Sequence, residues 1–266
     1  MKNLLLPLLL LLAGVAWGDN FSEAVKAHNA RNYNEAARLF KLSAAQGDAA
    51  SQFNLGIMYY TGQGIVQDYA EAAHWYKLSA AQGHAGAQFN LGHMYYDGQG
   101  VVQDYGEAVR LYKLSAAQGD AAAQSNLGVM YDRGQGVVQD YGEAVRLYKL
   151  SAAQGDAAAQ FNLGVMHAHG QGVVQDYGEA VRLYKLSAAQ GNAGAQFNLG
   201  FMYYNGRGVV QDYTRAHMWF NLAAVAGDKD SVSGRDTIAA KMTTQQIAEA
   251  QKMARACQAR NFKDCD

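Results

Sequence analysis

One stretch of this chain occurs three times without change. The nineteen residues from Val101 to Gly119 (VVQDYGEAVRLYKLSAAQG) recur at Val137–Gly155 and at Val173–Gly191, each time 36 residues further on. A fixed period of this length is typical of helical repeat proteins, in which every copy folds into the same small unit. One such unit cannot bury its apolar face alone, so neighbouring copies must stack. The sequence therefore predicts a stacked array of repeats.

Five full copies can be placed in register, and shorter segments flank them. The expected domains are a signal peptide (1–18), an N-terminal cap with a partial repeat (19–48), five repeats (49–84, 85–120, 121–156, 157–192 and 193–228) and a C-terminal cap (229–266). Caps are expected because the outermost repeats of an array would otherwise expose apolar surface to water.

The first half of each copy predicts a helix with one apolar face. In the first copy, Leu55, Met58 and Tyr59 recur at helical spacing. Gly56 lies among them, and its missing side chain lets a neighbouring helix approach closely. Gly62 then supplies the backbone freedom that ends the helix.

The second half of each copy predicts a second helix. Asp68 and Glu71 have the spacing of a capping box, in which Asp accepts bonds from free amides and Glu reaches back to the cap. Gly83 ends this helix, and the only proline of the chain is Pro7, so no proline interrupts the repeats. The expected fold is all-α, a right-handed solenoid superhelix of antiparallel helix pairs with a C-terminal capping helix.

The repeat pattern breaks after Asp228. Thr243 and Gln246 form a further capping-box candidate. The residues that then share one helical face are Ile247, Ala250, Ala254 and Cys257. We expect this helix to cover the last repeat.

The first 18 residues are typical of a secretory signal peptide. Lys2 precedes an apolar stretch from Leu4 to Leu12, and Ala16 and Gly18 are small residues where signal peptidase requires them. Cleavage after Gly18 is expected, giving a periplasmic or secreted protein. An uncleaved membrane anchor is the alternative, which the short apolar run disfavours.

The two cysteines, Cys257 and Cys265, both lie near the C-terminus. In an oxidising compartment two nearby thiols pair, so we expect a disulfide that closes a small loop. Free thiols or a metal site are the alternatives, and a metal site would need more ligands than the surrounding sequence offers.

Charge and motifs give no sign of nucleic-acid binding or catalysis. Lys and Arg number 22 against 23 Asp and Glu, whereas a protein that grips nucleic acid or an anionic membrane shows a basic excess or run. His167 and His169 are two residues apart on a predicted helix, so their side chains diverge and no metal site is expected. The Gly-Gln-Gly segments lack the Lys-Ser/Thr pair of a phosphate-binding loop. We expect no cofactor, no metal and no catalytic residue.

The repeated unit A-x-x-Q-F-N-L-G-x-M-Y-x-x-G-x-G-V-x-Q-D-Y-x-E-A-x-x-x-Y-K-L-S-A-A-Q-G resembles the Sel1-like repeat, a relative of the tetratricopeptide repeat. The resemblance covers Phe21 to Asp228, and the segment Met242–Ile247 resembles the closing segment of bacterial members. Members of this family act mainly as adaptors and scaffolds. The resemblance therefore implies a protein or peptide partner and names no ligand.

Some secreted members of that family carry a cysteine pair in every repeat and are described as penicillin-binding or β-lactamase-like. No repeat of this chain contains a cysteine, and no S-x-x-K nucleophile motif occurs in it. A β-lactamase-like hydrolase is therefore the least favoured function.

Stacked helix pairs form one concave face lined largely by the first helices, and such faces are the usual binding surfaces of solenoids. One asparagine recurs there in every copy: Asn54, Asn90, Asn126, Asn162 and Asn198. In tetratricopeptide relatives an asparagine at this position bonds to the backbone of a bound peptide. The alternative is that these asparagines bond to the adjacent repeat and hold the stack together.

Two further series lie on the same face. One series varies in character: Tyr60, Tyr96, Asp132, Ala168 and Tyr204. Its tyrosines could bury apolar peptide side chains or stack on sugar rings, so a glycan or peptidoglycan ligand is the alternative to a peptide. The other series is mostly aromatic, and ordinary packing between repeats is its favoured interpretation: Phe53, Phe89, Ser125, Phe161 and Phe197.

Overall fold

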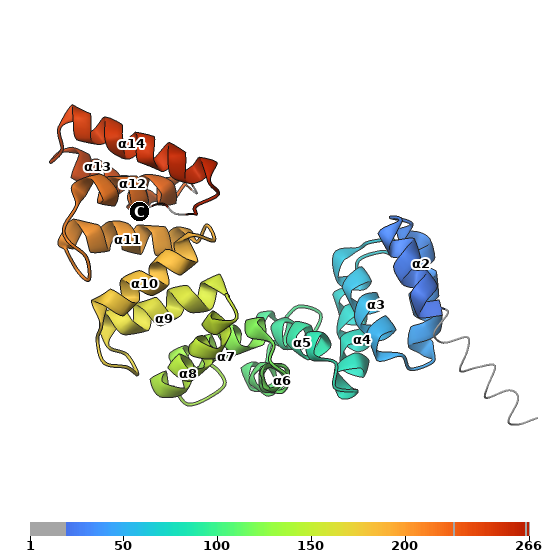
Figure 1. The fold of residues 1–266 in the computed structure, drawn as a ribbon. Coiled ribbons are helices and arrows are strands. Elements are labelled where there is room, and N and C mark those ends of the chain that lie inside the picture. The colour runs from blue at the N-terminus through green and yellow to red at the C-terminus, as the bar shows by residue number, and fades with distance from the viewer. Residues whose placement is uncertain (1–19, 226, 264, 266) are drawn as a thin grey trace, which may run out of the picture. The chain divides into compact units, whose positions relative to one another are not determined.

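The computed structural model describes residues 20–225, 227–263 and 265, and in this part of the chain all regular structure is helical. The predicted signal peptide lies outside the described residues. A helix over residues 20–29 precedes the labelled helices (Figure 1). The first helices of the repeats are α3 (Ala49–Thr61), α5 (Ala85–Asp97), α7 (Ala121–Arg133), α9 (Ala157–His169) and α11 (Ala193–Asn205). The second helices are α2 (Tyr33–Ala45), α4 (Tyr69–Ala81), α6 (Tyr105–Ala117), α8 (Tyr141–Ala153), α10 (Tyr177–Ala188) and α12 (Tyr213–Ala224).

Each full copy folds as a helix pair, and within each of two compact units neighbouring pairs pack on one another. The first and second helices of one copy contact each other, and the second helix contacts the first helix of the following copy, as α4 contacts both α3 and α5. The predicted all-helical fold of stacked pairs is confirmed. Within the described residues, no helix has the length and apolar character needed to cross a membrane.

The helices group into two compact units, which are described separately. Unit 1 comprises the described residues up to Ala123 together with Gln135–Val137. Unit 2 comprises Gln124–Gly134 and the described residues from Val138 onward. Buried apolar clusters lie within unit 1 and within unit 2.

In each compact unit, a tyrosine ring of the second helix packs against a glycine of the first helix of the same pair. A Cβ added to Gly56 on α3 would lie 2.6 Å from Cδ1 of Tyr76 on α4. In unit 2, a Cβ on Gly128 would lie 2.7 Å from Cε1 of Tyr148. Since real Cβ atoms do not approach so closely, the expected role of Gly56 is confirmed.

Two glycines shape the connection between the helices of a pair. Gly62 has φ +74° and ends α3, with its N–H donating to the Met58 carbonyl. Gly64 has φ +69° and lies against the backbone of Tyr33 in the preceding helix, where a side chain would collide. The connection therefore also contacts the preceding repeat.

The capping prediction was half right. Asp68 caps α4 by accepting from the amides of Ala70 at 2.9 Å and Glu71 at 3.1 Å. The glutamate half of the box was wrong: Glu107, which follows the cap residue Asp104, accepts two bonds from Arg110 at 2.6 and 2.8 Å. The guanidinium one turn later offers a charged, two-bond partner, which is stronger than one neutral backbone amide.

A buried glutamine joins four of the repeats to the preceding one. Gln52 is 4% exposed, and its Nε2 donates to the Ala44 carbonyl at 3.1 Å. Its Oε1 accepts from Gln82 at 2.7 Å, and Gln88 accepts from Gln118 in the same way at 2.8 Å. These bonds satisfy an amide that would be costly to bury unpaired.

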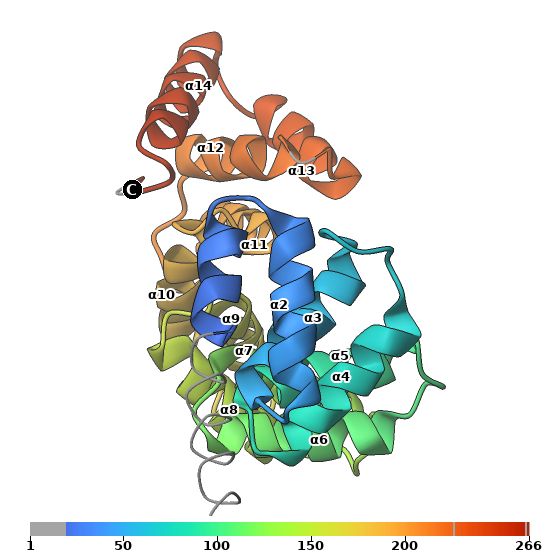
Figure 2. The same cartoon turned by 90° about the vertical axis from the view of Figure 1, so that its right-hand side faces the viewer.

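The C-terminal cap consists of α13 (Lys229–Ala239) and α14 (Thr244–Ala259), both of which contact α12 (Figure 2). The capping box of Thr243 and Gln246 is confirmed. Ala250, Ala254 and Cys257 are buried as expected, while Ile247 is only partly buried. Helix α13 was not anticipated by the sequence analysis.

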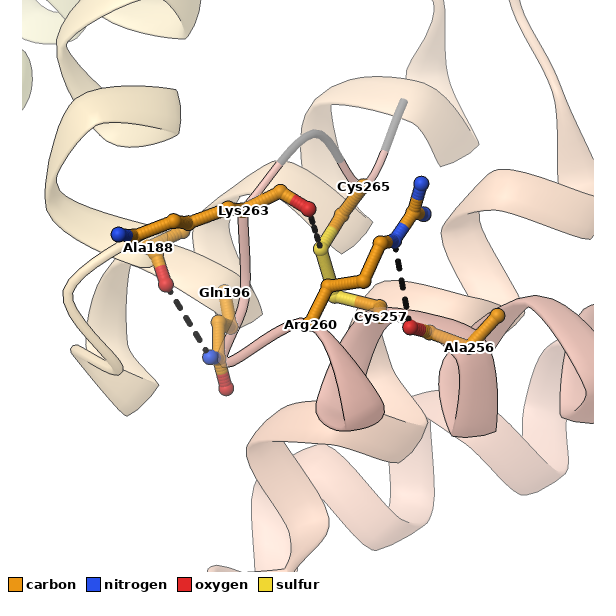
Figure 3. The surroundings of a disulfide bond; sticks show 7 residues. All are labelled: Ala188, Gln196, Ala256, Cys257, Arg260, Lys263 and Cys265. Carbon is orange, nitrogen blue, oxygen red and sulfur yellow. Dashed lines mark hydrogen bonds between the residues drawn. A yellow bond between two sulfur atoms is a disulfide. The ribbon is translucent and has the colours of Figure 1, made fainter.

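A disulfide closes the end of the cap. Cys257 and Cys265 are bonded, with their Cα atoms 5.0 Å apart, which confirms the predicted pair (Figure 3). Both belong to the core that includes Ala188 and Leu199 of the last repeats. In the closed loop, the Phe262 ring lies against Gly191, so the disulfide ties the cap to the repeats.

One buried histidine interrupts the apolar core beneath the cap. His217 on α12 is 2% exposed, and its Nδ1 has no hydrogen-bond partner among the described residues. Burial lowers the pKa of His217 below 6.5, the Arg235 charge lowers it further, and Asp236 opposes both. Valine occupies this position in three earlier copies: Val109, Val145 and Val181.

Replacing Gly56 with Ala should destabilise unit 1 by about 1–3 kcal/mol, because the added methyl overlaps a buried ring. The control is Gly106→Ala on α6, where a Cβ would meet only Asp104 Oδ1 at 3.3 Å. Ala70 already holds this position in the first copy, so this change should stabilise by about 0.5–1 kcal/mol. Urea unfolding checks both. Equal effects of the two substitutions would contradict the ring-on-glycine account.

Acid should loosen the C-terminal cap through His217. The pKa of His217 is lower in the folded protein than in the unfolded chain, so the neutral imidazole favours the folded state fully above pH 6.5. This stability is lost as the pH falls from 6.5 toward the folded pKa, because the unfolded chain takes up the proton more readily. His217→Val restores the residue of the earlier copies and should flatten this dependence. Hydrogen exchange of α12 and α13 amides at pH 7.5 and 5 measures it. The same acid sensitivity in both proteins would assign the effect to other groups.

Candidate binding site

Unit 1 contains a small cavity between two consecutive first helices. Its volume is about 150 Å³, and its lining comes from three helices: Tyr60 of α3, Tyr76 of α4, and Phe89, Asn90 and His93 of α5. We call this site the aromatic cavity. It brings together two residues predicted from the sequence to bind a ligand, Tyr60 and Asn90.

Tyr60 forms the rim of the aromatic cavity. Its hydroxyl donates to Oε1 of Gln99 at 2.8 Å, and its ring meets that of Tyr69 edge-on at 5.2 Å. Burial is the main cause that raises the pKa of Tyr60. The phenol is therefore neutral at physiological pH, and its oxygen can still accept a bond from a ligand.

Tyr76 and Asn90 form the floor. Tyr76 is 2% exposed, and burial raises its pKa to about 12. A hydrogen bond from the Asn90 side chain acts in the opposite direction, because it stabilises the oxygen that carries the phenolate charge. Asn90 thus bonds across the repeat boundary to the second helix of the preceding copy.

His93 adds a titratable group to the cavity wall. Its ring lies edge-on to that of Phe89 at 6.4 Å. Its Nδ1 is 3.0 Å from Oδ2 of Asp97, one turn later on α5. This contact orients the ring, so one edge of the imidazole faces the carboxylate and the wall keeps an aromatic surface.

The other asparagines differ in what they contact. Asn54 donates to the Ala50 carbonyl of its own helix at 2.8 Å. Asn198 repeats the arrangement of Asn90, with a side-chain bond to the buried Tyr184. Asn126 lies on α7 and Asn162 on α9, both partly buried. Two of the five therefore make the contact that the stacking interpretation expects, and peptide binding stays a prediction for the series.

The remaining predicted tyrosines have different surroundings. The Tyr96 hydroxyl donates to Gln135 at 3.2 Å, as Tyr60 does to Gln99 one copy earlier. Tyr204 instead contacts the cap, since Lys241 donates to its hydroxyl at 2.5 Å. The Lys241 ammonium also lies 4.8 Å from the centre of the Tyr204 ring. The structure therefore brings Tyr60 and Asn90 into one cavity and gives Tyr204 a partner within the chain.

The phenylalanine series packs within the repeats. Phe53 lies 6.0 Å from Tyr76, Phe161 lies 6.0 Å from Tyr184, and the Phe197 ring lies 5.3 Å from that of Phe220, all measured between centroids. These three contacts join the two helices of one copy, whereas packing between copies was predicted. The Phe53 ring also lies against Gly86 of the next copy. Only Phe89 also lines the aromatic cavity.

The site includes two residues that the sequence analysis did not select. His93 was treated as a scattered histidine, and Gln99 as part of a connection. The glutamine could have been found, because a Gly-Gln-Gly segment recurs after four of the first helices at one fixed distance from the tyrosine series. Within the described part of the chain, no group of three or more His, Cys, Asp or Glu side chains could hold a metal ion.

Comparison with known proteins connects the chain to one repeat family. The Sel1 repeat model matches residues 30–48, 49–84, 85–120, 121–156, 157–192 and 193–228. The comparison with curated protein sequences finds no match.

Two solved structures are similar in fold and sequence. A protective antigen present in uropathogenic Escherichia coli strains, displaying an SLR fold, matches with a TM-score of 0.81 at 34% identity. That match covers 88% of this chain and 50% of the antigen, so the chain spans half of the antigen's length. A Sel1 repeat protein from Oxalobacter formigenes matches with a TM-score of 0.77 at 32% identity, covering 83% of this chain and 88% of that one.

Asn90→Ala should destabilise unit 1 by about 1–3 kcal/mol, because it leaves the Tyr76 hydroxyl buried without its partner. Asn54→Ala is the matched control and should cost about 0.5 kcal/mol or less, since it loses only a bond to its own helix. Adding Tyr76→Phe to Asn90→Ala should recover most of the loss. Urea unfolding measures all three proteins, and a double variant as unstable as Asn90→Ala would refute the pairing.

Proposed function

Because the chain belongs to the Sel1 repeat family, we propose that it is a protein-interaction scaffold whose aromatic cavity binds one side chain of a partner's extended peptide segment. The aromatic cavity is the single observation that carries this proposal. The chain has the stacked repeats of a scaffold, and such arrays bind their partners along the faces that the stacking creates.

The size of the aromatic cavity favours a side chain over a whole small molecule. Pockets for drug-sized ligands and cofactors measure roughly 300–1,000 Å³. The aromatic cavity measures about 150 Å³, which suits one apolar or aromatic residue of a longer ligand. Buried aromatic contacts of this kind commonly carry a large share of the binding energy in peptide recognition.

The chemistry of the walls supports the same ligand. The aromatic surfaces of Tyr60, Phe89 and His93 can bury an apolar side chain. The Tyr60 oxygen at the rim can accept a bond from a ligand amide while its proton is donated to Gln99. An extended peptide offers both groups, an apolar side chain and a backbone N–H beside it.

We also propose that the protein acts outside the cytoplasm, in the periplasm or after secretion. The disulfide of Cys257 and Cys265 indicates an oxidising compartment. The signal-like segment before Asp19 supports export, with cleavage after Gly18.

A glycan ligand is the alternative from the sequence. A sugar carries several hydroxyl groups that need polar partners, whereas the cavity walls are mainly aromatic and the Tyr60 proton is already donated to Gln99. The peptide proposal is therefore preferred, and glycan binding becomes an outcome of the test below. A hydrolytic role is not proposed, and turnover of nitrocefin by the purified protein would contradict this choice.

The proposal is tested by panning a random peptide library, displayed on phage, against residues 19–266 with the disulfide formed. We expect captured peptides to share an apolar or aromatic residue. Tyr60→Ala and His93→Ala should each weaken a synthetic captured peptide about tenfold in isothermal titration calorimetry.

The matched control is His74→Ala, an exposed histidine on α4 outside the cavity lining. It should leave the affinity unchanged. If neither Tyr60→Ala nor His93→Ala changed the affinity for the captured peptides, the peptides would bind outside the aromatic cavity. Binding of muropeptides alone, with no peptide captured, would support the glycan alternative.

A further inference from the structure

The residues that line the aromatic cavity have equivalents in unit 2, with two chemical changes. Two periods after the cavity residues come Asp132 of α7, Tyr148 of α8, and Phe161, Asn162 and Val165 of α9. Tyrosine is thereby replaced by aspartate at the rim and histidine by valine on the wall. All five positions belong to unit 2.

The tyrosine at the floor of this second site lacks a partner. Tyr148 is 1% exposed, and among the described residues its hydroxyl forms no hydrogen bond. Its equivalents Tyr76 and Tyr184 are each bonded by an asparagine of the next copy. A buried hydroxyl without a partner is uncommon in native proteins, and the group therefore needs an explanation.

Asp132 introduces a carboxylate at the position that Tyr60 holds at the rim of the aromatic cavity. The side chain is partly buried, and burial raises the pKa of Asp132 while the neighbouring Arg133 opposes that rise. Burial raises the pKa of Tyr148, and the Asp132 charge raises it further. The equivalent residues of the first copy, Tyr60 and Tyr76, line one cavity, so the repeat brings Asp132 and Tyr148 to the same site. Gln139 donates to the backbone carbonyl of Asp132 at 2.6 Å, and this bond does not involve the carboxylate.

The last copy shows what this rim position can receive. Tyr204 lies two periods after Asp132, and the Lys241 ammonium donates to its hydroxyl at 2.5 Å. A lysine side chain from the cap thus already occupies the equivalent position. A carboxylate at this position attracts a cation more strongly than a phenol does.

We propose that Asp132, Tyr148 and Asn162 form a subsite for a lysine or arginine side chain of the bound peptide. The cation donates one bond to the Asp132 carboxylate and one to the Tyr148 oxygen, which gives the buried hydroxyl its missing partner. Asn162 flanks the cation with an amide oxygen that can also accept. This inference rests on the proposed function and adds the charge of the ligand to it.

The test uses the same displayed library with three baits: wild type, Asp132→Asn and Asp132→Tyr. The first variant keeps the shape and removes the charge, and the second restores the tyrosine of three other copies. We expect peptides captured by the wild type to be enriched in lysine or arginine at one position. Both variants should lose this enrichment and keep the apolar preference of the aromatic cavity.

Affinities then test the pairing directly. For a synthetic peptide from the wild-type pool, Asp132→Asn and replacement of the basic peptide residue by glutamine should each weaken binding about tenfold, or about 1.4 kcal/mol. When the Asp132→Asn protein is measured with the glutamine-substituted peptide, the loss of affinity should be little larger than for either change alone. Tyr148→Phe should weaken the same peptide by a smaller factor.

The outcomes separate the two proposals. Peptides that bind through Tyr60 and His93 but show no basic preference would overturn the cation subsite alone. Capture of no peptide by any bait would overturn the proposed function, and the subsite with it. Additive losses in the combined experiment would show that the basic residue binds somewhere other than Asp132.

Discussion

The packing of a tyrosine ring on a glycine determines most of the rest of the structure. Because Gly56 has no side chain, Tyr76 lies flat against the first helix and brings the pair close together. The phenol then ends at the boundary with the next copy, where Asn90 can reach its oxygen. The same placement makes the ring the floor of the aromatic cavity. One steric fit thus fixes the helix spacing, a polar contact between repeats and a binding surface.

Buried polar groups give the stack its register. Gln52 accepts from Gln82 and donates to Ala44, so its amide is fully engaged by a second helix on each side. Such bonds add little net stability, but leaving one unmade costs the whole desolvation penalty. A slipped stack would therefore be penalised at every copy. Several buried atoms among the described residues lack a hydrogen-bond partner, including the hydroxyl of Tyr148. Its equivalents Tyr76 and Tyr184 are bonded by an asparagine, and this difference directs attention to the site around Asp132.

The sequence predicted the features that depend on local pattern. It predicted the repeat period, the helix pairs, the role of Gly56, the Thr243 capping box and the disulfide, because each of these depends on residue type and spacing. Helix α13 was not predicted, because only two of its residues, Ser231 and Ile238, are buried and it has no clear apolar face. The cavity was predicted in part: Tyr60 and Asn90 were selected, whereas His93 and Gln99 depend on three-dimensional contacts between copies. The capping role of Glu107 was wrong because Arg110 competes for its carboxylate.

The unchanged nineteen-residue segment has an evolutionary consequence. Contacts between copies recur at the same sequence separation, as in the bonds of Gln52 to Ala44 and of Gln88 to Ala80. Gain or loss of one whole copy by recombination would therefore join ends that still fit. The segment itself contains none of the rim positions occupied by Tyr60, Asp132 and their equivalents. A lineage could in this way alter the length of the array and the identity of its ligand by separate genetic events.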